Sequence, residues 1–193
     1  MGRKSTYNVA VVGAMGMVGT EMIETLERRG FPIAELRPLD IEENEGKTVE
    51  FKGQKVEVKE ANEENFKGID IAIFSAGGDA SLDLAPKAVR QGAVVVDNSS
   101  AWRMDPECPL VVPEVNPEDL DWHKGIIANP NCSTIQMMVA LKPLHDYGTI
   151  KRVVVSTYQA VSGSGKKAFE GLKDETRQFI ETGYIENPRA YHY

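Results

Sequence analysis

Short, continuous apolar runs recur along the first two thirds of the sequence, and such runs are typical of buried strands. They span residues 8–12, 36–40, 69–75, 94–97 and 126–128. The segments after the first and third runs repeat apolar residues at helical spacing, namely Val18, Met22, Ile23 and Leu26, then Leu84, Ala85, Ala88 and Val89. This alternation of strand and helix predicts an α/β fold with a doubly wound parallel sheet of the Rossmann type.

Two weaker local signals accompany these runs. Residues 49–51 and 56–58 alternate in polarity around Gly53, which favours a small hairpin. Ser81 stands just ahead of the second apolar helical pattern, and a serine hydroxyl often satisfies the free N–H groups of a helix start. We therefore expect Ser81 to cap that helix.

The pattern restarts after residue 130. Apolar residues from Ile135 to Leu144 have helical character, and residues 153–158 form a β-branched run that predicts a strand. After a glycine-rich turn, residues 166–182 have the pattern of an amphipathic helix whose apolar face comprises Phe169, Leu172, Thr176, Phe179 and Ile180. We therefore predict a domain boundary near residue 130, with one domain at 1–130 and the start of a second at 131–193.

The composition is that of an ordinary folded protein, and it narrows the classes of function. Of 193 residues, 41% are hydrophobic and 26% are charged, and 22 Lys and Arg against 29 Asp and Glu give a net charge of −7. This balance argues against a general nucleic-acid binder, which carries a basic face. The sequence has no secretory signal and no run of about 20 apolar residues, so we expect no membrane span and a cytoplasmic location. Two cysteines make no disulfide framework, and we predict no metal site.

A glycine-rich turn joins the first predicted strand to the first predicted helix. Its sequence is Gly13-Ala14-Met15-Gly16-Met17-Val18-Gly19. A dinucleotide-binding unit requires this order, because Gly16 lets the backbone approach a pyrophosphate, Gly19 lets helix and strand pack closely, and the helix start donates N–H groups. Asp40 ends the second strand, where a carboxylate usually binds the adenine ribose 2′-hydroxyl and repels a 2′-phosphate. The alternative is a tight turn that holds no ligand.

A cysteine lies at the start of the helix that follows residue 130. Cys132 is preceded by the apolar run 125–128 and by Asn129-Pro130-Asn131. The N–H groups and the dipole of a helix start favour thiolate over thiol, and thiolate is the form that attacks a carbonyl carbon. The alternative is a capped helix that merely begins with a small apolar residue.

Four groups of residues together resemble the family of aspartate-semialdehyde dehydrogenases in their order and spacing. They are Asp97-Asn98-Ser99-Ser100 with Arg103, Val112-Pro113-Glu114-Val115-Asn116, Asn129-Pro130-Asn131-Cys132-Ser133-Thr134, and Thr157-Tyr158-Gln159-Ala160-Val161-Ser162-Gly163. The resemblance implies an NADP-dependent, phosphorylating aldehyde dehydrogenase. Such an enzyme reduces aspartyl phosphate to aspartate semialdehyde through a cysteine acyl-thioester, on the route to lysine, threonine and methionine.

The resemblance also implies how the chain is divided and how it assembles. Residues 1–130 correspond to the dinucleotide-binding domain, and residues 131–193 to the first part of an α+β catalytic and dimerisation domain. Members of the family form dimers or tetramers, so we expect a homo-oligomer that acts on a small-molecule substrate.

The family's motifs assign roles to residues of this sequence. Cys132 corresponds to the nucleophile, Gln159 holds the substrate or orients the attacking group, Arg103 binds the phosphate, and Asn131 lies beside the thiol. A guanidinium suits a dianionic acyl phosphate because it donates in a planar, bidentate fork; the alternative for Arg103 is a surface salt bridge. The candidate cofactor-binding residues are Gly13, Met15, Gly16, Met17, Val18, Gly19, Asp40, Glu43, Asn44, Ser75, Ser162 and Gly163.

The sequence departs from the family at the cofactor. An arginine-serine pair usually holds the 2′-phosphate of NADP after the second strand, and Glu43 and Asn44 stand at those positions here. We therefore expect weakened selectivity for NADP, with NAD accepted or preferred. The alternative is a solvated acidic loop, with other groups holding the 2′-phosphate.

The family is also much longer than this chain. Its acid/base histidine, a substrate-binding arginine and a lysine correspond to no residue here, and His123, His145 and His192 lie outside the catalytic motif. Because a general acid/base contributes about 10²–10⁴-fold, we predict that the 193-residue chain turns over semialdehyde very slowly or not at all. Two alternatives are an N-acetyl-glutamyl-phosphate reductase with the same cysteine chemistry and a non-catalytic dinucleotide-binding module.

Overall fold

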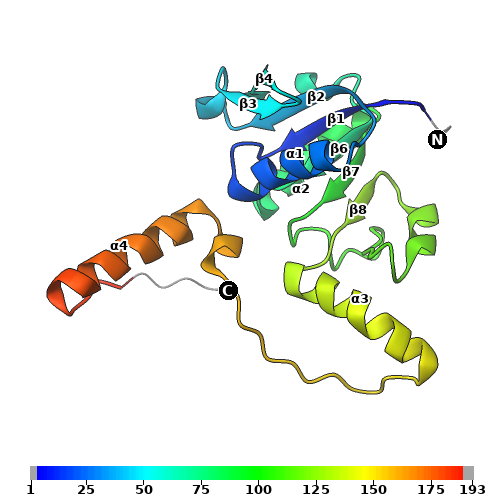
Figure 1. Cartoon of the computed structure of the whole chain (residues 1–193). Helices are drawn as coiled ribbons and strands as arrows, with labels where there is room; N and C mark the ends of the chain where they lie inside the picture. The colour runs from blue at the N-terminus through cyan, green and yellow to red at the C-terminus, as the bar shows by residue number, and fades with distance from the viewer. Residues whose placement is uncertain (1–3, 189–193) are drawn as a thin grey trace.

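A six-stranded parallel sheet forms the centre of the first part of the chain (Figure 1). The computed structural model describes residues 4–188. The strand order is β5-β2-β1-β6-β7-β8, and each neighbouring pair is parallel. The predicted α/β fold with a Rossmann-type sheet is confirmed. The strands are β1 (Tyr7–Val12), β2 (Ile33–Asp40), β5 (Lys59–Glu60), β6 (Ile71–Phe74), β7 (Val94–Asp97) and β8 (Ile126–Ala128).

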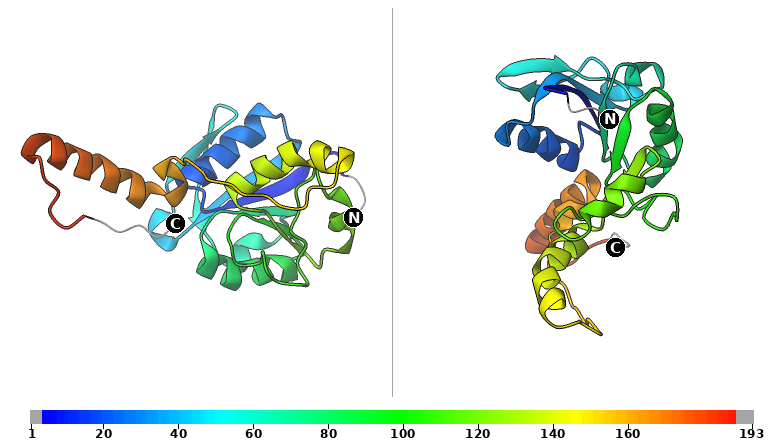
Figure 2. Two further views of the ribbon diagram at one scale, coloured as in Figure 1. Left: turned by 90° about the horizontal axis from the view of Figure 1, so that it is seen from below. Right: turned by 90° about the vertical axis from the view of Figure 1, so that its right-hand side faces the viewer.

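Helices cover both faces of this sheet (Figure 2). In β1, Val11 belongs to the buried cluster under α1 (Met17–Arg28), whereas Ala10 and Val12 belong to the cluster under α2 (Gly78–Arg90). Successive side chains of a strand point to opposite faces, so α1 and α2 lie on opposite sides of the sheet. This burial on both faces explains why the strands are continuous apolar runs.

A two-stranded antiparallel hairpin packs on the α1 side of the sheet. Its strands are β3 (Thr48–Phe51) and β4 (Gln54–Glu57), and Phe51 joins the buried cluster under α1. The predicted hairpin is confirmed. Its turn lies at Lys52 and Gly53, whose φ angles of 50° and 71° suit the type I′ turns that join twisted strands. Short 3₁₀ segments complete this part of the chain: η1 (Glu42–Asn44), η2 (Glu64–Phe66) and η3 (Pro117–Trp122).

Ser81 does not cap α2, so that prediction was wrong. The N-cap of α2 is Gly77, with φ of 87°, and Ser81 lies inside the helix. The Ser81 side chain is fully buried, and its hydroxyl donates a hydrogen bond of 2.6 Å to Oδ1 of Asp97. The Ser81 hydroxyl therefore binds a buried carboxylate on β7, although the local sequence predicts that it binds the free N–H groups of the helix start.

The second part of the chain is helical. It contains α3 (Cys132–Tyr147), the short η4 (Val161–Ser164) and α4 (Lys166–Thr182). Both predicted helices are confirmed. The sheet ends with β8 at Ala128 and α3 begins at Cys132, but the domain boundary near residue 130 stays a prediction.

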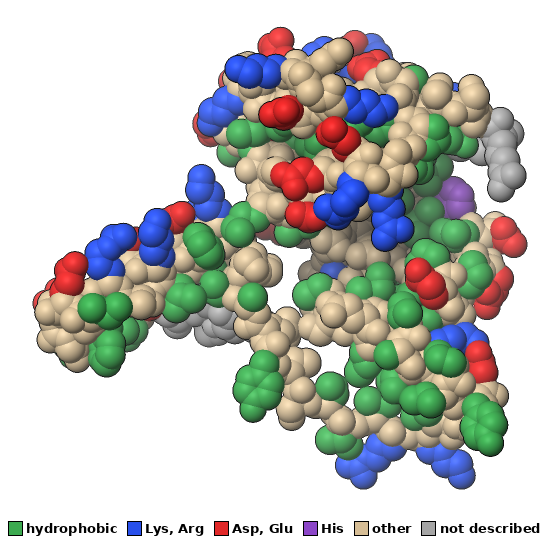
Figure 3. Space-filling model, in the orientation of Figure 1, with side chains coloured by type: hydrophobic (Ala, Val, Ile, Leu, Met, Phe, Trp, Pro, Cys, Tyr) green, Lys and Arg blue, Asp and Glu red, His purple; other side chains and the backbone are tan. Residues whose placement is uncertain are grey.

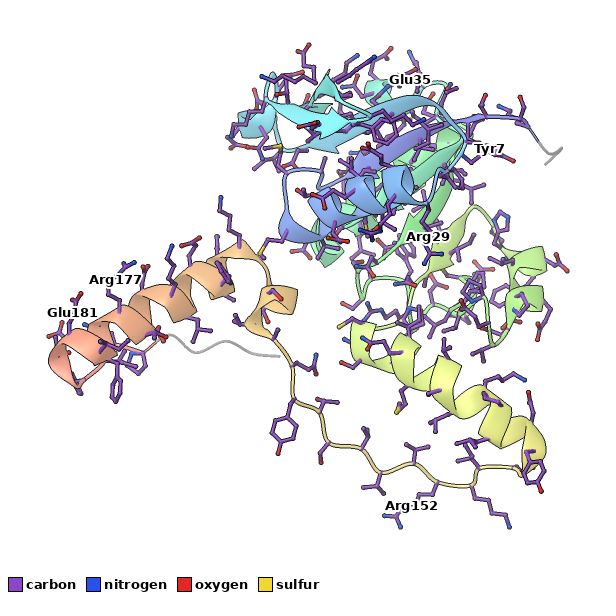
Figure 4. The ribbon with its side chains drawn as sticks, in the orientation of Figure 1. Tyr7, Arg29, Glu35, Arg152, Arg177 and Glu181 are labelled. Atoms are coloured by element: carbon purple, nitrogen blue, oxygen red, sulfur yellow. The ribbon has the colours of Figure 1, made fainter. Side chains whose placement is uncertain are left out.

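The segment between α3 and η4 is extended but is not a strand. Residues 149–160 have no regular secondary structure, and within residues 4–188 no strand pairs with them. The strand predicted at 153–158 is therefore wrong for this structure, because a β-branched run becomes a strand only when another backbone supplies its hydrogen bonds. Tyr158 is fully exposed, and Figure 4 shows Arg152 pointing away from the rest of the fold.

Helix α4 exposes an apolar face. Its charged side chains follow one edge of the helix and its hydrophobic side chains the other (Figure 3). The exposed apolar residues are Phe169, Leu172, Phe179 and Ile180, whereas Ala168 and Gly171 are buried. An apolar stripe of this kind is the part of an amphipathic helix that normally packs against another element.

Candidate functional site

A cavity of about 480 Å³ lies between the start of α3 and the segment that leads into α4. It brings together four of the predicted site residues, Cys132, Gln159, Ser162 and Gly163. Cys132 comes from the first turn of α3, Gln159 from the extended segment, and Ser162 and Gly163 from η4. The cavity is also lined by residues to which the sequence assigned no role: Ser133, Gln136, Thr157, Tyr158 and Ala160.

Cys132 is the first residue of α3, and its side chain is exposed. Asn131 is the N-cap: its Oδ1 accepts a hydrogen bond of 3.0 Å from the backbone N–H of Ser133. Asparagine is a favoured N-cap because its short side chain reaches the free N–H groups of the first turn. The cap fixes the thiol at the end of the helix where the dipole favours an anion.

The second cysteine has the opposite environment. Cys108 is buried, and burial raises the pKa of its thiol. Its sulfur lies 3.4 Å from the carbonyl oxygen of Ile126, within the packing of β8. A buried thiol with a raised pKa is a poor nucleophile, so the chain presents one accessible cysteine at a helix start and one inert cysteine.

Gln159 faces the cavity with a defined orientation. Its Oε1 accepts a hydrogen bond of 2.9 Å from the hydroxyl of Thr157. This bond engages the amide oxygen of Gln159 and leaves its NH2 group available to donate. A threonine two residues before the glutamine is a local signal that the sequence pattern alone did not single out.

Arg103 lies in the loop that follows β7, and two backbone carbonyls hold it. Its Nε donates to the carbonyl oxygen of Asn129 at 2.9 Å, and one Nη donates to the carbonyl oxygen of Asn98 at 3.1 Å. None of the ion pairs recorded for residues 4–188 involves Arg103, so the alternative of a surface salt bridge is wrong. Arg103 is not among the residues that line the Cys132 cavity; the link between them is Asn129, which shortly precedes Cys132.

The glycine turn lies at the carboxyl edge of the sheet and leaves no room for a side chain at Gly13 or Gly19. A Cβ on Gly13, whose φ is +82°, would lie 2.5 Å from the carbonyl oxygen of Ser75. A Cβ on Gly19 would lie 2.0 Å from the carbonyl oxygen of Gly13. The turn therefore brings α1, β1 and the end of β6 into direct backbone contact, as the binding of a pyrophosphate at a helix start requires.

A second cavity, of about 260 Å³, opens beside this turn. Four predicted cofactor-binding residues line it: Gly13, Gly16, Asp40 and Ser75. Gly16 is the N-cap of α1, so the first N–H groups of the helix lie at this edge. These groups fit a dinucleotide. The glycines permit close approach of the backbone, the helix start donates N–H groups to phosphate, and the carboxylate at the end of β2 can accept a hydrogen bond from a ribose hydroxyl. The remaining candidates lie nearby in the sequence: Met15, Met17, Val18 and Gly19 on the turn and the first turn of α1, and Glu43 and Asn44 in η1.

Asp40 has a structural role that the sequence did not indicate. Its Oδ2 accepts a hydrogen bond of 2.8 Å from the backbone N–H of Met15. Its Oδ1 accepts from the backbone N–H of Ile41 at 2.9 Å and from Nδ2 of Asn44 at 2.8 Å. Since a carboxylate offers about four acceptor positions, these bonds leave room for one more, such as a ribose hydroxyl.

Neither histidine of the described residues belongs to the Cys132 cavity. His123 and His145 use Nδ1 to accept backbone N–H groups, from Gly125 at 3.1 Å and Ile150 at 3.3 Å. His192 lies outside the described residues. Within residues 4–188 no group of His, Cys, Asp or Glu is arranged to hold a metal ion. No helix of that part is both long and apolar enough to cross a membrane.

The strand order and the glycine turn define a Rossmann-type dinucleotide-binding domain. The family model "Semialdehyde dehydrogenase, NAD binding domain" matches residues 8–123, and the model "Semialdehyde dehydrogenase, dimerisation domain" matches residues 141–193. The chain therefore belongs to the semialdehyde dehydrogenase family.

Curated relatives agree with this assignment. The chain is 62% identical over 178 residues to the aspartate-semialdehyde dehydrogenase of Aquifex aeolicus. This match covers 91% of this chain and 52% of the relative. It is 53% identical over 179 residues to the Bacillus subtilis enzyme of the same name, covering 93% of this chain and 52% of the relative. The chain thus spans about half the length of the curated relatives it matches. The predicted resemblance is confirmed, and the matches do not favour the N-acetyl-glutamyl-phosphate reductase alternative.

Solved structures give the same picture. The crystal structure of aspartate semialdehyde dehydrogenase II of Vibrio cholerae complexed with ASA has a TM-score of 0.92 and 46% identity, covering 98% of this chain and 57% of that chain. The enzyme of Candida albicans with NADP has a TM-score of 0.65 and 28% identity, covering 75% of this chain and 48% of that chain.

Proposed function

We propose that this chain carries the cofactor domain and the acyl-accepting thiol of an aspartate-semialdehyde dehydrogenase. The observation that supports this most directly is the shared cavity, in which Cys132 and Gln159 face the same space. Identity of 62% to a relative of that name, with the cysteine and glutamine motifs intact in the sequence, supports the substrate class. The substrate is aspartyl phosphate in the reducing direction and aspartate semialdehyde with phosphate in the other.

The chemical step at Cys132 follows from its position. The thiolate attacks the carbonyl carbon of the acyl phosphate, the bond from that carbon to the phosphate oxygen breaks, and phosphate leaves with the electron pair. Cys132 stands at the start of α3, where free N–H groups and the helix dipole favour an anion, and the N-cap Asn131 holds the first turn in place. The amide of Gln159, oriented by Thr157, offers N–H donors to the substrate oxygen on which charge develops.

Arg103 supplies the charge that this substrate needs. Two carbonyl groups engage Nε and one Nη of its guanidinium, so the remaining N–H donors of the fork have a fixed direction. A fixed, planar donor fork suits a phosphoryl group better than a flexible ammonium does. We infer that Arg103 binds the phosphate of the substrate near the start of α3.

We propose that the cofactor is a nicotinamide dinucleotide and that NAD is accepted or preferred over NADP. A bound dinucleotide supplies the hydride that reduces the acylated carbon. The chain's contribution is the turn at Gly13 and Gly16 for the pyrophosphate, and Asp40 and Glu43 near the adenine ribose. Two carboxylates at that place oppose a 2′-phosphate, because like charges repel. The alternative, in which other groups hold the 2′-phosphate, predicts a preference for NADP.

Alkylation of the two cysteines tests the proposed site in the chain as it stands. The intact protein is treated with iodoacetamide, and the labelled peptides are quantified by mass spectrometry with and without NAD(H) or NADP(H). Cys132 is expected to react much faster than the buried Cys108, and bound cofactor is expected to change its rate. Slow labelling of Cys132, similar to that of Cys108, would support a non-catalytic dinucleotide-binding module instead.

Steady-state turnover tests a separate part of the proposal. Neither described histidine lines the Cys132 cavity, so the proton transfers around the acylated thiol lack the usual acid/base group within residues 4–188. We expect one round of acylation without rapid turnover. A turnover rate typical of complete enzymes of this family would refute that expectation.

A further inference from the structure

A buried carboxylate lies directly behind the Arg103 loop and has no part in the chemistry above. Asp97 ends β7, and its side chain is completely buried. Oδ1 accepts a hydrogen bond of 2.6 Å from the hydroxyl of Ser81. Oδ2 accepts 2.6 Å and 3.1 Å bonds from the hydroxyl and the backbone N–H of Ser99. A buried carboxylate held by these neutral donors costs free energy to desolvate, and its short charge-assisted bonds are correspondingly strong and directional.

Ser81 joins this carboxylate to the loop. Its hydroxyl oxygen donates to Asp97 and also accepts a hydrogen bond of 3.0 Å from Nε1 of Trp102, the residue before Arg103. The Ser99 hydroxyl in turn accepts from the backbone N–H of Ala101 at 3.1 Å. The loop between Asp97 and Arg103 is therefore fixed at three residues. Ser99 binds the Asp97 carboxylate directly, whereas Ala101 binds it through Ser99 and Trp102 through Ser81.

The two carbonyl groups that hold the guanidinium are tied to the same place. One belongs to Asn98, the residue after Asp97, and the other to Asn129, whose backbone N–H donates to the carbonyl of Asp97 at 2.8 Å. The two asparagine side chains also bond each other, with Nδ2 of Asn129 donating to Oδ1 of Asn98 at 2.7 Å. Movement of the end of β7 would thus shift both acceptors of Arg103 together.

We propose that Asp97 and Ser81 are positioning residues: they fix the 98–103 loop and so aim the Arg103 guanidinium at the anionic group of the substrate. The inference rests on the proposed function, in which Arg103 binds a phosphoryl group. Neither Asp97 nor Ser81 touches the substrate. They act through Trp102, Asn98 and Asn129, and their contribution to anion binding exists only while Arg103 is present.

The test measures the affinity of the 193-residue chain for inorganic phosphate by calorimetric titration. Arg103→Ala is expected to abolish binding or weaken it at least about tenfold. Ser81→Ala removes both bonds of the hydroxyl and leaves Arg103 intact, and it is expected to weaken binding about three- to tenfold. The control Ser100→Ala, at an exposed position of the same loop, is expected to leave the affinity unchanged.

The double variant Ser81→Ala/Arg103→Ala separates positioning from a general loss of stability. If Ser81 acts through Arg103, the double variant binds phosphate no more weakly than Arg103→Ala alone. A purely structural role would lower the melting temperature of Ser81→Ala without changing its phosphate affinity, and this result would overturn the inference. Should Ser81→Ala fail to fold, Trp102→Phe removes only the Nε1 donor and is expected to weaken binding in the same direction.

The outcomes distinguish this inference from the proposed function. If Arg103→Ala weakens binding while Ser81→Ala and Trp102→Phe do not, the positioning role is wrong and the role of Arg103 stands. If the unsubstituted chain does not bind phosphate, or if Arg103→Ala binds it normally, the proposed role of Arg103 is wrong and the inference fails with it.

Discussion

The carboxylate of Asp40 accepts a hydrogen bond of 2.8 Å from the backbone N–H of Met15. Asp40 is the last residue of β2, and Met15 lies in the glycine turn after β1, so this bond ties the two strand ends together beside the 260 Å³ cavity. The same carboxylate holds Asn44 in η1. One side chain thus organises both the glycine turn and η1, the two segments that we propose lie at the pyrophosphate and at the adenine ribose.

Replacing Asp40 should therefore damage the turn as well as the ribose contact. Asp40→Ala leaves the N–H groups of Met15 and Ile41 without their acceptor, and we expect the free energy of unfolding to fall by about 1–3 kcal/mol. The affinity for NADH should fall together with it. Urea denaturation and NADH fluorescence titration measure the two effects. The control Glu42→Ala, at an exposed position in η1, should change neither. If Asp40→Ala bound NADH more weakly but kept the free energy of unfolding, the carboxylate would contact the cofactor without stabilising the turn.

Cofactor selection should respond to charge at Glu43. This residue is exposed in η1, beside the Asn44 that Asp40 holds. Glu43→Arg replaces a charge that repels a 2′-phosphate with one that attracts it, so the ratio of NADPH to NADH affinity should rise about tenfold or more. Fluorescence titration with both reduced cofactors measures the ratio. Glu45→Arg makes the same charge change one residue beyond η1 and should have the smaller effect; equal effects would mean that net charge alone is responsible.

Sequence reasoning succeeded where the signal is local. The strand, glycine turn and helix from Tyr7 to Arg28 are adjacent in sequence, and each has its own pattern of apolar residues or glycines. The same holds for α4, whose amphipathic period defined its bounds. The shared cavity of Cys132 and Gln159 was accessible only through the resemblance to a family, because no periodicity relates residues on α3 to residues of an extended segment.

The failures concern partners that are distant in sequence. Serine is a common N-cap, but the Ser81 hydroxyl binds Asp97 on β7. The residues around Ser81 in the sequence give no sign of that contact. Residues 153–158 have the composition of a strand, but within residues 4–188 no strand pairs with them, so they form none. Asp40 has a plausible ligand role by its place after β2, and its bond to Met15 becomes visible only when the two loops are folded together.

The cap of α3 should matter for both stability and reactivity. Asn131→Ala removes the acceptor of the Ser133 N–H and should cost about 0.5–2 kcal/mol of stability. It should also slow the alkylation of Cys132, because a frayed first turn no longer presents its N–H groups to the thiolate. Asn131→Asp keeps the cap but places a negative charge beside the sulfur. Asn131→Asp should therefore keep the stability of the unsubstituted chain but still slow the alkylation of Cys132 by iodoacetamide. If both variants reacted as fast as the unsubstituted chain, the helix start would not activate Cys132.

Asp70 should give the fold a defined dependence on pH. Hydrogen bonds from the Lys4 ammonium and from the backbone N–H of Asn8 lower the pKa of its carboxyl group. Since the folded-state pKa is depressed, the stabilisation is present above the ordinary carboxyl pKa of about 4 and is lost as pH falls through the folded-state value. Asp70→Asn should therefore be less stable than the unsubstituted chain at pH about 7, and the difference should disappear in acid.

Urea denaturation of both proteins across this range of pH measures the effect. The control Asp121→Asn, at an exposed position in η3, should show no comparable difference. A difference for Asp70→Asn that stayed constant from neutral pH into acid would mean that the carboxylate acts through packing and not through its charge.

The exposed face of α4 should make copies of this chain associate. Phe179 and Ile180 are 55% and 77% exposed, and the family's dimerisation domain matches residues 141–193. Burial of such side chains against another chain is favourable by about 25 cal/mol per Å² of apolar surface. Phe179→Glu/Ile180→Glu places charges on this face and should shift the chain toward monomer, as measured by light scattering after size-exclusion chromatography. Gln178→Glu adds a charge on the opposite face of α4 by helical spacing and should leave the association intact. A chain that is monomeric at all concentrations, with or without these substitutions, would show that the face does not bind a second copy.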